Sequence, residues 1–398
     1  MRDCCKILVF VGIFLLSFGC ETPKEVRFDI SNPIAMDRFQ ETIELDLTHL
    51  KSLISEFGHE QLVVQNVETG ALLVNQWIDF NGDGQMNQWI FQTDVASKAK
   101  QGYVVRPLAE GETQPTSKQS TYSRFVPERT DDYAWENDRV AFRTYGPEAQ
   151  RRVEENEFGG TLTSGMDAWL KRVDYPIINK WYKKNEEEVG AYHIDTGEGY
   201  DPYHVGPSRG IGGLGFWMED SLYTSRNFIK YQKLAEGPIR TVFKLSYNSW
   251  QVGEQMIAEE KLISLDLGSN MTRFQSIFTG EGSFPAAAVG ITLHDNSGKT
   301  HIDNSAGVFS YWEEIDQSML GTGIVITADQ LDKGVDKKVD YVDGSHLLVI
   351  TKPGQEKVDY YAGFGWERSK QYTSHGEWNE YLNQFAEKVN NPLQVEFL

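Results

Sequence analysis

Residues 192–215 bring together side chains that can move protons and bind anions. The run reads YHIDTGEGYDPYHVGPSRGIGGLG and includes seven glycines, which permit positive φ angles and close approach of the backbone to a ligand. Histidine acts as base or acid near neutral pH, tyrosine does so when its pKa is shifted, and arginine fits a carboxylate with two N–H groups. The run therefore predicts a site for proton transfer. Its chemically active members are His193, Asp195, Glu198, Tyr200, Asp201, Tyr203, His204 and Arg209.

Proton abstraction beside a carboxylate needs a base, an acid for the leaving group and a positive charge on the carboxylate. We assign His193 or His204 as the base, Tyr203 or Tyr200 as the acid, and Arg209 as the group that holds the carboxylate. The alternative is that the histidines are hydrogen-bonded loop residues and that the arginine forms a structural ion pair.

Three further residues are candidates for substrate binding. Lys171 and Arg172 follow a tryptophan and could add positive charge, although they could equally lie on the solvated face of a strand. His294 stands at the end of an expected strand and is a weaker candidate for the same pocket.

A divalent metal is the one cofactor that the run could hold. His193, Asp195 and His204 offer two imidazoles and a carboxylate, and residues two apart on an extended segment share a face. The segment Asp79–Asn87 also resembles a calcium loop, but Ile90 stands where a bidentate glutamate belongs. A hairpin turn is the favoured interpretation of that segment.

Other classes of protein receive little support. The chain has no Gly-x-Ser-x-Gly elbow, no P-loop and no dinucleotide-binding glycine pattern in a strand–turn–helix setting. Its 38 basic and 58 acidic residues give a net charge of −20, which repels nucleic acid but still allows an acidic substrate in a locally basic pocket.

The N-terminus is typical of a bacterial lipoprotein signal. Arg2 and Lys6 precede the apolar run Ile7–Phe18, and Gly19 precedes Cys20. We expect cleavage after residue 19, acylation of the Cys20 thiol and a protein attached to the bacterial cell envelope through its lipid alone; an uncleaved N-terminal anchor is the alternative. The three cysteines all lie within the first 20 residues, so the mature monomer has no disulfide.

Short alternating strands separated by turns predict an all-β fold. We expect a tether over residues 20–36, a small β domain over 37–107 and a main β-sandwich over 123–398, with a linker at Leu108–Tyr122. Residues 241–265 predict a long antiparallel hairpin. Two helices are expected, a short one at Thr48–Phe57 and a C-terminal one at Glu377–Val389.

Three runs, Arg124–Gly146, Ser164–Tyr182 and Tyr192–Gly215, resemble in order a family of Bacteroidetes lipoproteins catalogued as a domain of unknown function (number 4861). The later run YYAGFGWERSK also looks like that family, and the resemblance covers residues 37–398. It implies a supersandwich of the galactose-mutarotase type. It also implies a place in loci that degrade uronic-acid-rich polysaccharides such as pectin and ulvan.

One activity linked to that family is dehydration of a terminal uronic acid on an oligosaccharide. The resemblance therefore implies a carbon–oxygen lyase with an acidic oligosaccharide as partner. Aromatic residues of a sandwich are usually core, but Trp217, just past the glycine run, is the tryptophan that we expect to stack on a sugar ring. A polysaccharide-lyase-like enzyme and a non-catalytic glycan-binding lipoprotein are the alternatives. A hydrolase that pairs Glu198 with Asp201 or Asp167 is a third.

Overall fold

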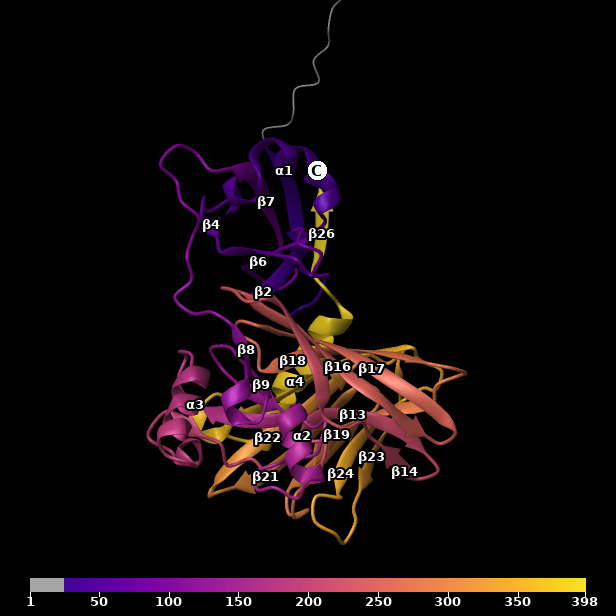
Figure 1. The fold of residues 1–398 in the computed structure, drawn as a ribbon. Coiled ribbons are helices and arrows are strands. Elements are labelled where there is room, and N and C mark those ends of the chain that lie inside the picture. Colours follow the sequence, from indigo (N-terminus) through magenta and orange to yellow (C-terminus); the bar gives the residue numbers. More distant parts are fainter. Residues whose placement is uncertain (1–24) are drawn as a thin grey trace, which may run out of the picture.

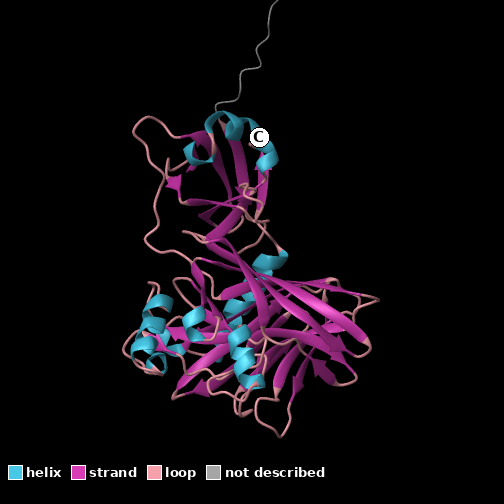
Figure 2. Ribbon diagram, in the orientation of Figure 1, coloured by secondary structure: helices cyan, strands magenta, loops and turns pink. Residues whose placement is uncertain are grey.

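The computed structural model describes residues 25–398, so the predicted signal peptide and the acylated Cys20 lie outside the described residues. A small N-terminal domain stands on a larger sandwich, and the two are joined near the C-terminal helix α4 (Figure 1). Among residues 25–398, none of the helices combines the length and apolar character needed to cross a membrane. Strands predominate over helices in both parts of the molecule (Figure 2).

The small domain packs two antiparallel sheets around one apolar core. The order of the larger sheet is β26-β1-β7-β3-β4 and that of the smaller is β2-β6-β5. Leu53 of the short helix α1 and Trp89 are fully buried in this core. The elements are β1 (Val26–Ser31), β2 (Arg38–Leu45), α1 (Lys51–Phe57), β3 (Leu62–Asn66), β4 (Leu72–Leu73), β5 (Asn75–Ile78), β6 (Gln88–Val95), β7 (Lys100–Pro107) and β26 (Gln394–Phe397).

Two expectations about this domain were wrong. The predicted tether over residues 20–36 contains strand β1, because alternate side chains there, Phe28 and Ile30, are buried in the core. The C-terminal strand β26 belongs to the small domain and not to the sandwich, since it pairs with β1 in the register Phe28↔Phe397. The small domain is therefore built from both ends of the described chain (Figure 1).

The segment Asp79–Asn87 is the turn of the β5–β6 hairpin, in which Ile78 pairs with Gln88. The Asp79 carboxylate accepts hydrogen bonds from the backbone amides of Gly82 and Gly84, each at 2.8 Å. Its oxygens serve the turn geometry, as the hairpin interpretation predicted.

The sandwich consists of a five-stranded and an eight-stranded sheet, which bury a common core of aromatic and aliphatic side chains. The five-stranded sheet has the order β14-β13-β19-β24-β23 and the other β15-β16-β17-β18-β25-β22-β21-β20. The first sheet contains β13 (Ile211–Met218), β14 (Ser221–Tyr223), β19 (Ala286–Thr292), β23 (Leu331–Lys337) and β24 (His346–Thr351). The second contains β15 (Phe228–Ala235), β16 (Arg240–Val252), β17 (Gln255–Asp266), β18 (Met271–Gly280), β20 (Lys299–Asp303), β21 (Val308–Ile315), β22 (Ser318–Ile326) and β25 (Lys357–Trp366).

The predicted all-β sandwich is confirmed, and the long hairpin is β16–β17, which turns between Val252 and Gln255. The predicted C-terminal helix is α4 (His375–Asn390), capped by the Ser374 side chain. Its residue Trp378 packs on β22, where Gly321 leaves room for the indole.

A third five-stranded sheet, in the order β12-β11-β10-β9-β8, lies beside the sandwich and carries two helices that periodicity did not predict (Figure 2). Its elements are β8 (Tyr122–Val126), β9 (Asp132–Glu136), β10 (Ala141–Thr144), α2 (Pro147–Glu154), β11 (Asp167–Lys171), α3 (Ile178–Glu187) and β12 (Gly199–Tyr200). Short 3-10 turns complete the chain at Leu47–His49, His59–Gln61, Pro127–Arg129, Ala191–His193 and Glu367–Ser369.

The contribution of β26 to the small domain can be tested at Phe397. Its ring stacks on His49 with centroids 4.3 Å apart and lies 5.5 Å from the ring of Phe28. We expect Phe397→Ala to lower the free energy of unfolding by about 2 kcal/mol, because a partly buried aromatic ring is lost from the core. Urea denaturation monitored by tryptophan fluorescence measures this. The exposed neighbour Leu398 supplies the control Leu398→Ala, and equal stability of the two variants would contradict a structural role for β26.

Candidate functional site

The segment from Gly190 to Arg209 crosses the edge of the third sheet and carries most of the residues singled out from the sequence. Two glycines hold it close to strand β11. Gly199 and Gly210 have φ angles of +117° and +56°, and a Cβ atom at either would collide with a backbone oxygen of that strand or its approach. Only glycine fits such positions, so these two residues fix the path of the segment.

A buried ionic cluster anchors the same segment to the sheet. The Arg143 guanidinium on β10 donates to Asp167 on β11 at 2.6 Å and to Asp201 at 2.8 Å, and lies 3.5 Å from Asp132 on β9. It also donates to the Tyr192 hydroxyl at 3.3 Å. All four charged side chains are inaccessible to solvent or nearly so.

Burial and the neighbouring Asp167 raise the pKa of Asp201 well above its ordinary value, against the opposing charge of Arg143. Sequence reasoning assigned Asp201 and Asp167 as alternative partners of Glu198 in a hydrolase. In the structure both aspartates form ion pairs with Arg143. The Glu198 carboxylate instead accepts hydrogen bonds from Lys180 and from the Tyr175 hydroxyl. A solvent-facing pair of carboxylates is therefore not formed by these residues.

His193 presents a ring nitrogen to solvent. Its Nδ1 lies 2.6 Å from the backbone oxygen of Asp201, and its side chain is 52% exposed. A carbonyl oxygen can only accept a hydrogen bond, so Nδ1 carries a proton, and in the neutral ring Nε2 has the free lone pair. This arrangement fits a general base.

His204 is held in a similar way by a different acceptor. Its Nε2 lies 3.1 Å from the carboxylate of Asp343, which is almost buried, while the His204 side chain is 65% exposed. The carboxylate orients the ring and leaves Nδ1 facing outward. Asp343 lies in the loop before β24, and its partnership with His204 could not be foreseen because 139 residues separate them.

His294, by contrast, has no free nitrogen. Its Nδ1 lies 2.8 Å from the Glu313 carboxylate and its Nε2 lies 2.8 Å from the backbone oxygen of His204. Both neighbours are acceptors, so the ring is an imidazolium that supports the His204 segment. The backbone of His294 also has a positive φ of +42°, an unfavourable conformation of the kind concentrated at functional sites.

Arg172 lies beside a second arginine that sequence reasoning missed. Arg172 forms an ion pair with Asp195, and the Arg368 guanidinium lies 3.7 Å from the same carboxylate. Both guanidinium groups lie over the Trp366 ring, at 5.4 Å and 5.8 Å from its centroid. Two positive charges thus share one negative charge at a partly exposed position. Arg368 falls within the YYAGFGWERSK run, which was the available signal.

Tyr200 borders this arginine pair. Its ring centroid lies 6.0 Å from that of Trp366, and its hydroxyl donates to Asp316 at 2.7 Å. Burial and the hydrogen bond to Asp316 raise the pKa of Tyr200 to about 12, so the phenol keeps its proton at neutral pH. Asp316 lies in the β21–β22 turn, and its backbone oxygen accepts a hydrogen bond from Arg368 at 2.9 Å.

Three predicted contacts with substrate are wrong, because the side chains face the interior. Arg209 is buried and donates to the hydroxyls of Thr163 and Ser164, and burial lowers its pKa to about 10. Tyr203 is buried with its ring edge against His294. Lys171 is also buried, where Glu136 and two backbone oxygens accept all three of its N–H groups.

The predicted metal triad is not formed either. Asp195 is occupied by Arg172, while His193 and His204 have separate acceptors. Over residues 25–398 no group of three His, Cys, Asp or Glu side chains has the spacing of a metal site. Trp217 is half-buried on β13, and the Lys337 ammonium lies 5.2 Å from the centre of its ring. Its recorded contacts include neither arginine of the pair.

The sequence profile of the family described as domain of unknown function (DUF4861) matches residues 30–395. An uncharacterized protein, P7, of Formosa agariphila is 44% identical over 397 residues, which cover 98% of each chain. Among solved structures, a glycosyl hydrolase family 38 protein from Enterococcus faecalis matches with a TM-score of 0.52 and 10% identity, over 94% of this chain and 47% of that one. An α-mannosidase from the same species matches with a TM-score of 0.49 and 11% identity, over 94% and 46%. The chain thus spans about half the length of these solved structures, and the first of them supports the sandwich fold.

The His294–Glu313 pair makes stability depend on pH. Burial opposes the charge of His294, but the hydrogen bond and charge of Glu313 outweigh it and raise the histidine pKa; burial also raises the pKa of Glu313. The native state therefore binds more protons than the unfolded state. The stability that His294 contributes is complete below about pH 6.5 and is lost as the pH rises through its raised pKa, and the raised pKa of Glu313 adds a loss that begins above its ordinary value of 4.5.

We expect the free energy of unfolding of the natural chain to fall with pH across this window more steeply than that of Glu313→Gln. Urea denaturation at a series of pH values measures both slopes. Identical slopes in the two proteins would show that the pair does not carry the effect.

Proposed function

The chain belongs to the DUF4861 family, and we propose that it is a carbon–oxygen lyase acting on acidic oligosaccharides. It removes water from a terminal uronic acid and leaves an unsaturated uronate. The sandwich shared with a glycosyl hydrolase family 38 protein supports a carbohydrate as substrate. The site on the 190–209 segment supports the type of reaction.

The observation that carries the proposal is the pair Arg172 and Arg368, which share the single carboxylate of Asp195. Two guanidinium groups contact this one carboxylate, while the Asp316 carboxylate nearby accepts from the Tyr200 hydroxyl. A uronate carboxylate supplies the missing negative charge, and a guanidinium binds it with two parallel hydrogen bonds. The same charge stabilises the enolate-like state that forms when the adjacent carbon loses its proton.

His193 is the base in this scheme. His193 stands two residues before Asp195, the partner of the arginine pair, and the intervening Ile194 is extended. Nε2 takes the proton from the carbon next to the carboxylate. The electron pair of that C–H bond forms the double bond, and the hydroxyl on the next carbon leaves.

His204, oriented by Asp343, is the acid that protonates the departing hydroxyl, giving water, because its exposed imidazole can carry a proton near neutral pH. Tyr200, the other candidate, is only 4% exposed and donates its hydroxyl proton to Asp316, so it supports the site from the interior. The product keeps its glycosidic bonds, so the chain length of the oligosaccharide does not change.

We further propose that the mature protein is anchored to the bacterial cell envelope through lipid on Cys20. The order of basic residues, apolar run and Gly-Cys supports this location. An envelope protein meets oligosaccharides before they enter the cytoplasm.

The test is incubation of the chain lacking residues 1–20 with uronate-terminated oligosaccharides, followed by absorbance in the short-wavelength ultraviolet, where the uronate double bond absorbs, and by mass spectrometry. We expect rising absorbance and the loss of one water per oligosaccharide without shortening. Shorter unsaturated fragments would indicate a polysaccharide lyase instead. If the protein bound the oligosaccharides but converted none of them, it would be a glycan-binding protein and not an enzyme.

Replacement of the base provides the second test. We expect His193→Gln to lower kcat by about 100-fold or more, because proton transfer loses its positioned acceptor, while binding of the oligosaccharide persists. His49→Gln, an exposed histidine of the small domain, is the matched control and should keep full activity. Unchanged kcat in His193→Gln would contradict the assignment of the base.

A further inference from the structure

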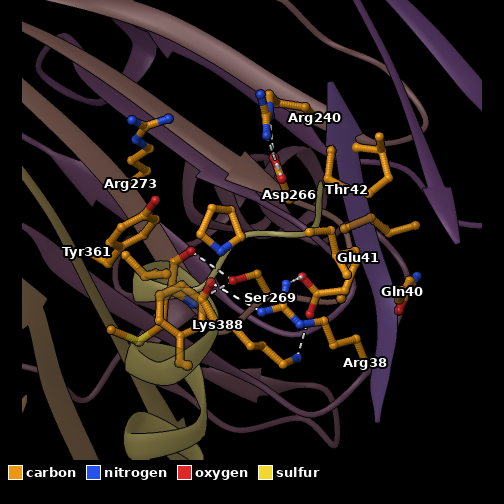
Figure 3. A pocket seen from close by; sticks show the side chains of 18 of the residues that line it. Arg38, Gln40, Glu41, Thr42, Arg240, Asp266, Ser269, Arg273, Tyr361 and Lys388 are labelled. Atoms are coloured by element: carbon orange, nitrogen blue, oxygen red, sulfur yellow. Dashed lines mark hydrogen bonds and ion pairs between the residues drawn. The ribbon is translucent and has the colours of Figure 1, made fainter. Parts of the chain in front are cut away.

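A cavity of about 460 Å³ lies between the small domain and the sandwich. None of the residues that line it belongs to the 190–209 segment. Strand β2 forms one wall, the β17–β18 turn another, and the end of α4 a third (Figure 3). A volume of this size lies in the range of sites for small ligands.

Ion pairs line the cavity and expose both donors and acceptors. Figure 3 shows Arg240 beside Asp266 at one end and Lys388 near Glu41 at the other. Arg240 contacts both Asp266 oxygens, and the Lys388 ammonium lies 2.6 Å from Glu41. Paired charged groups of this kind can bind the neighbouring hydroxyls of a sugar, because each pair both donates and accepts.

Arg38 is the least satisfied of these charges. Its side chain is 2% exposed, and its Nε donates to no group within the described residues. One terminal nitrogen donates to the backbone oxygens of Lys388 and Asn391, and the nearest carboxylate, Glu41, is 4.0 Å away and already bound to Lys388. Burial lowers the pKa of Arg38, so the charged guanidinium is held there at a cost that an anionic ligand would offset.

An exposed aromatic side chain stands beside Arg38. Phe39 is 69% exposed and also lines the cavity. The pairing of β2 with β6 is irregular between Arg38 and Glu41, and Gln40 in this bulge has a positive φ of +53°. Bulges redirect side chains and recur next to functional sites, and an aromatic face is a surface on which a sugar ring can stack.

We propose that this cavity is a second carbohydrate site, which binds a carboxylated sugar residue through Arg38 and Phe39. The carboxylate lies toward the Arg38 guanidinium, the hydroxyls meet the ion pairs, and the ring covers Phe39. The class of sugar rests on the function proposed above, whereas the position of the site does not. Its use would be to hold another part of the oligosaccharide while the terminal residue reacts elsewhere.

The test uses isothermal titration calorimetry with a uronic-acid disaccharide whose terminal residue is already unsaturated, so that no turnover occurs. We expect two binding sites in the chain lacking residues 1–20. Phe39→Ala should weaken one of them about tenfold, the loss of one stacked aromatic contact. Because Phe39 is exposed, this variant should fold normally, which circular dichroism checks. Phe158→Ala, which removes an aromatic ring that is 95% exposed elsewhere, is the matched control and should leave both sites unchanged.

Arg172→Gln separates this proposal from the proposed function. We expect it to weaken the other site and to leave the one that depends on Phe39. Equal binding by Phe39→Ala and the natural chain would overturn the cavity proposal. A loss in Phe39→Ala together with no effect of Arg172→Gln would leave the cavity proposal standing and contradict the role of the arginine pair.

Discussion

The buried guanidinium of Arg143 is the interaction on which the site segment depends. It joins three aspartates from β9, β11 and the segment after β12, in an interior that water does not reach. Burial raises the pKa of Asp201 well above its ordinary value, so this carboxyl holds a proton more readily, and the neighbouring Arg129 adds a second positive charge to the cluster. Removing one partner of such a cluster leaves the others uncompensated, which is costly in a dry interior.

The anchored segment places the groups that act at its surface. The backbone oxygen of Asp201 fixes the tautomer of His193, while the Asp201 side chain holds the segment to the sheet, so one residue serves both position and chemistry. His294 supports the same segment at His204 through its imidazolium. The arginine pair combines Arg172, next to β11, with Arg368 from the distant end of β25, so the site forms only when the third sheet docks beside the sandwich.

Alternation and turn spacing were sufficient to predict the sandwich, the β16–β17 hairpin and helix α4, because these elements bury one face in a regular pattern. Strand β26 could not be predicted as part of the small domain, since its pairing with β1 joins the two ends of the described chain. At the site, the sequence singled out the run that carries His193, but a pattern of residue types does not say which side chains turn inward. Arg209 was therefore misassigned, and Arg368 was missed because its partner Asp195 is far away along the chain.

If the Asp201 carboxylate positions the segment that carries His193, its removal loosens that segment. Amide hydrogen exchange in Asp201→Ala tests it most directly, because the variant keeps the backbone oxygen that His193 uses. The backbone N–H of residue 201 donates to the Tyr192 oxygen at 2.8 Å and reports on the segment. We expect faster exchange over residues 191–204 with unchanged protection in β16 and β17. Unchanged exchange over 191–204 would contradict it.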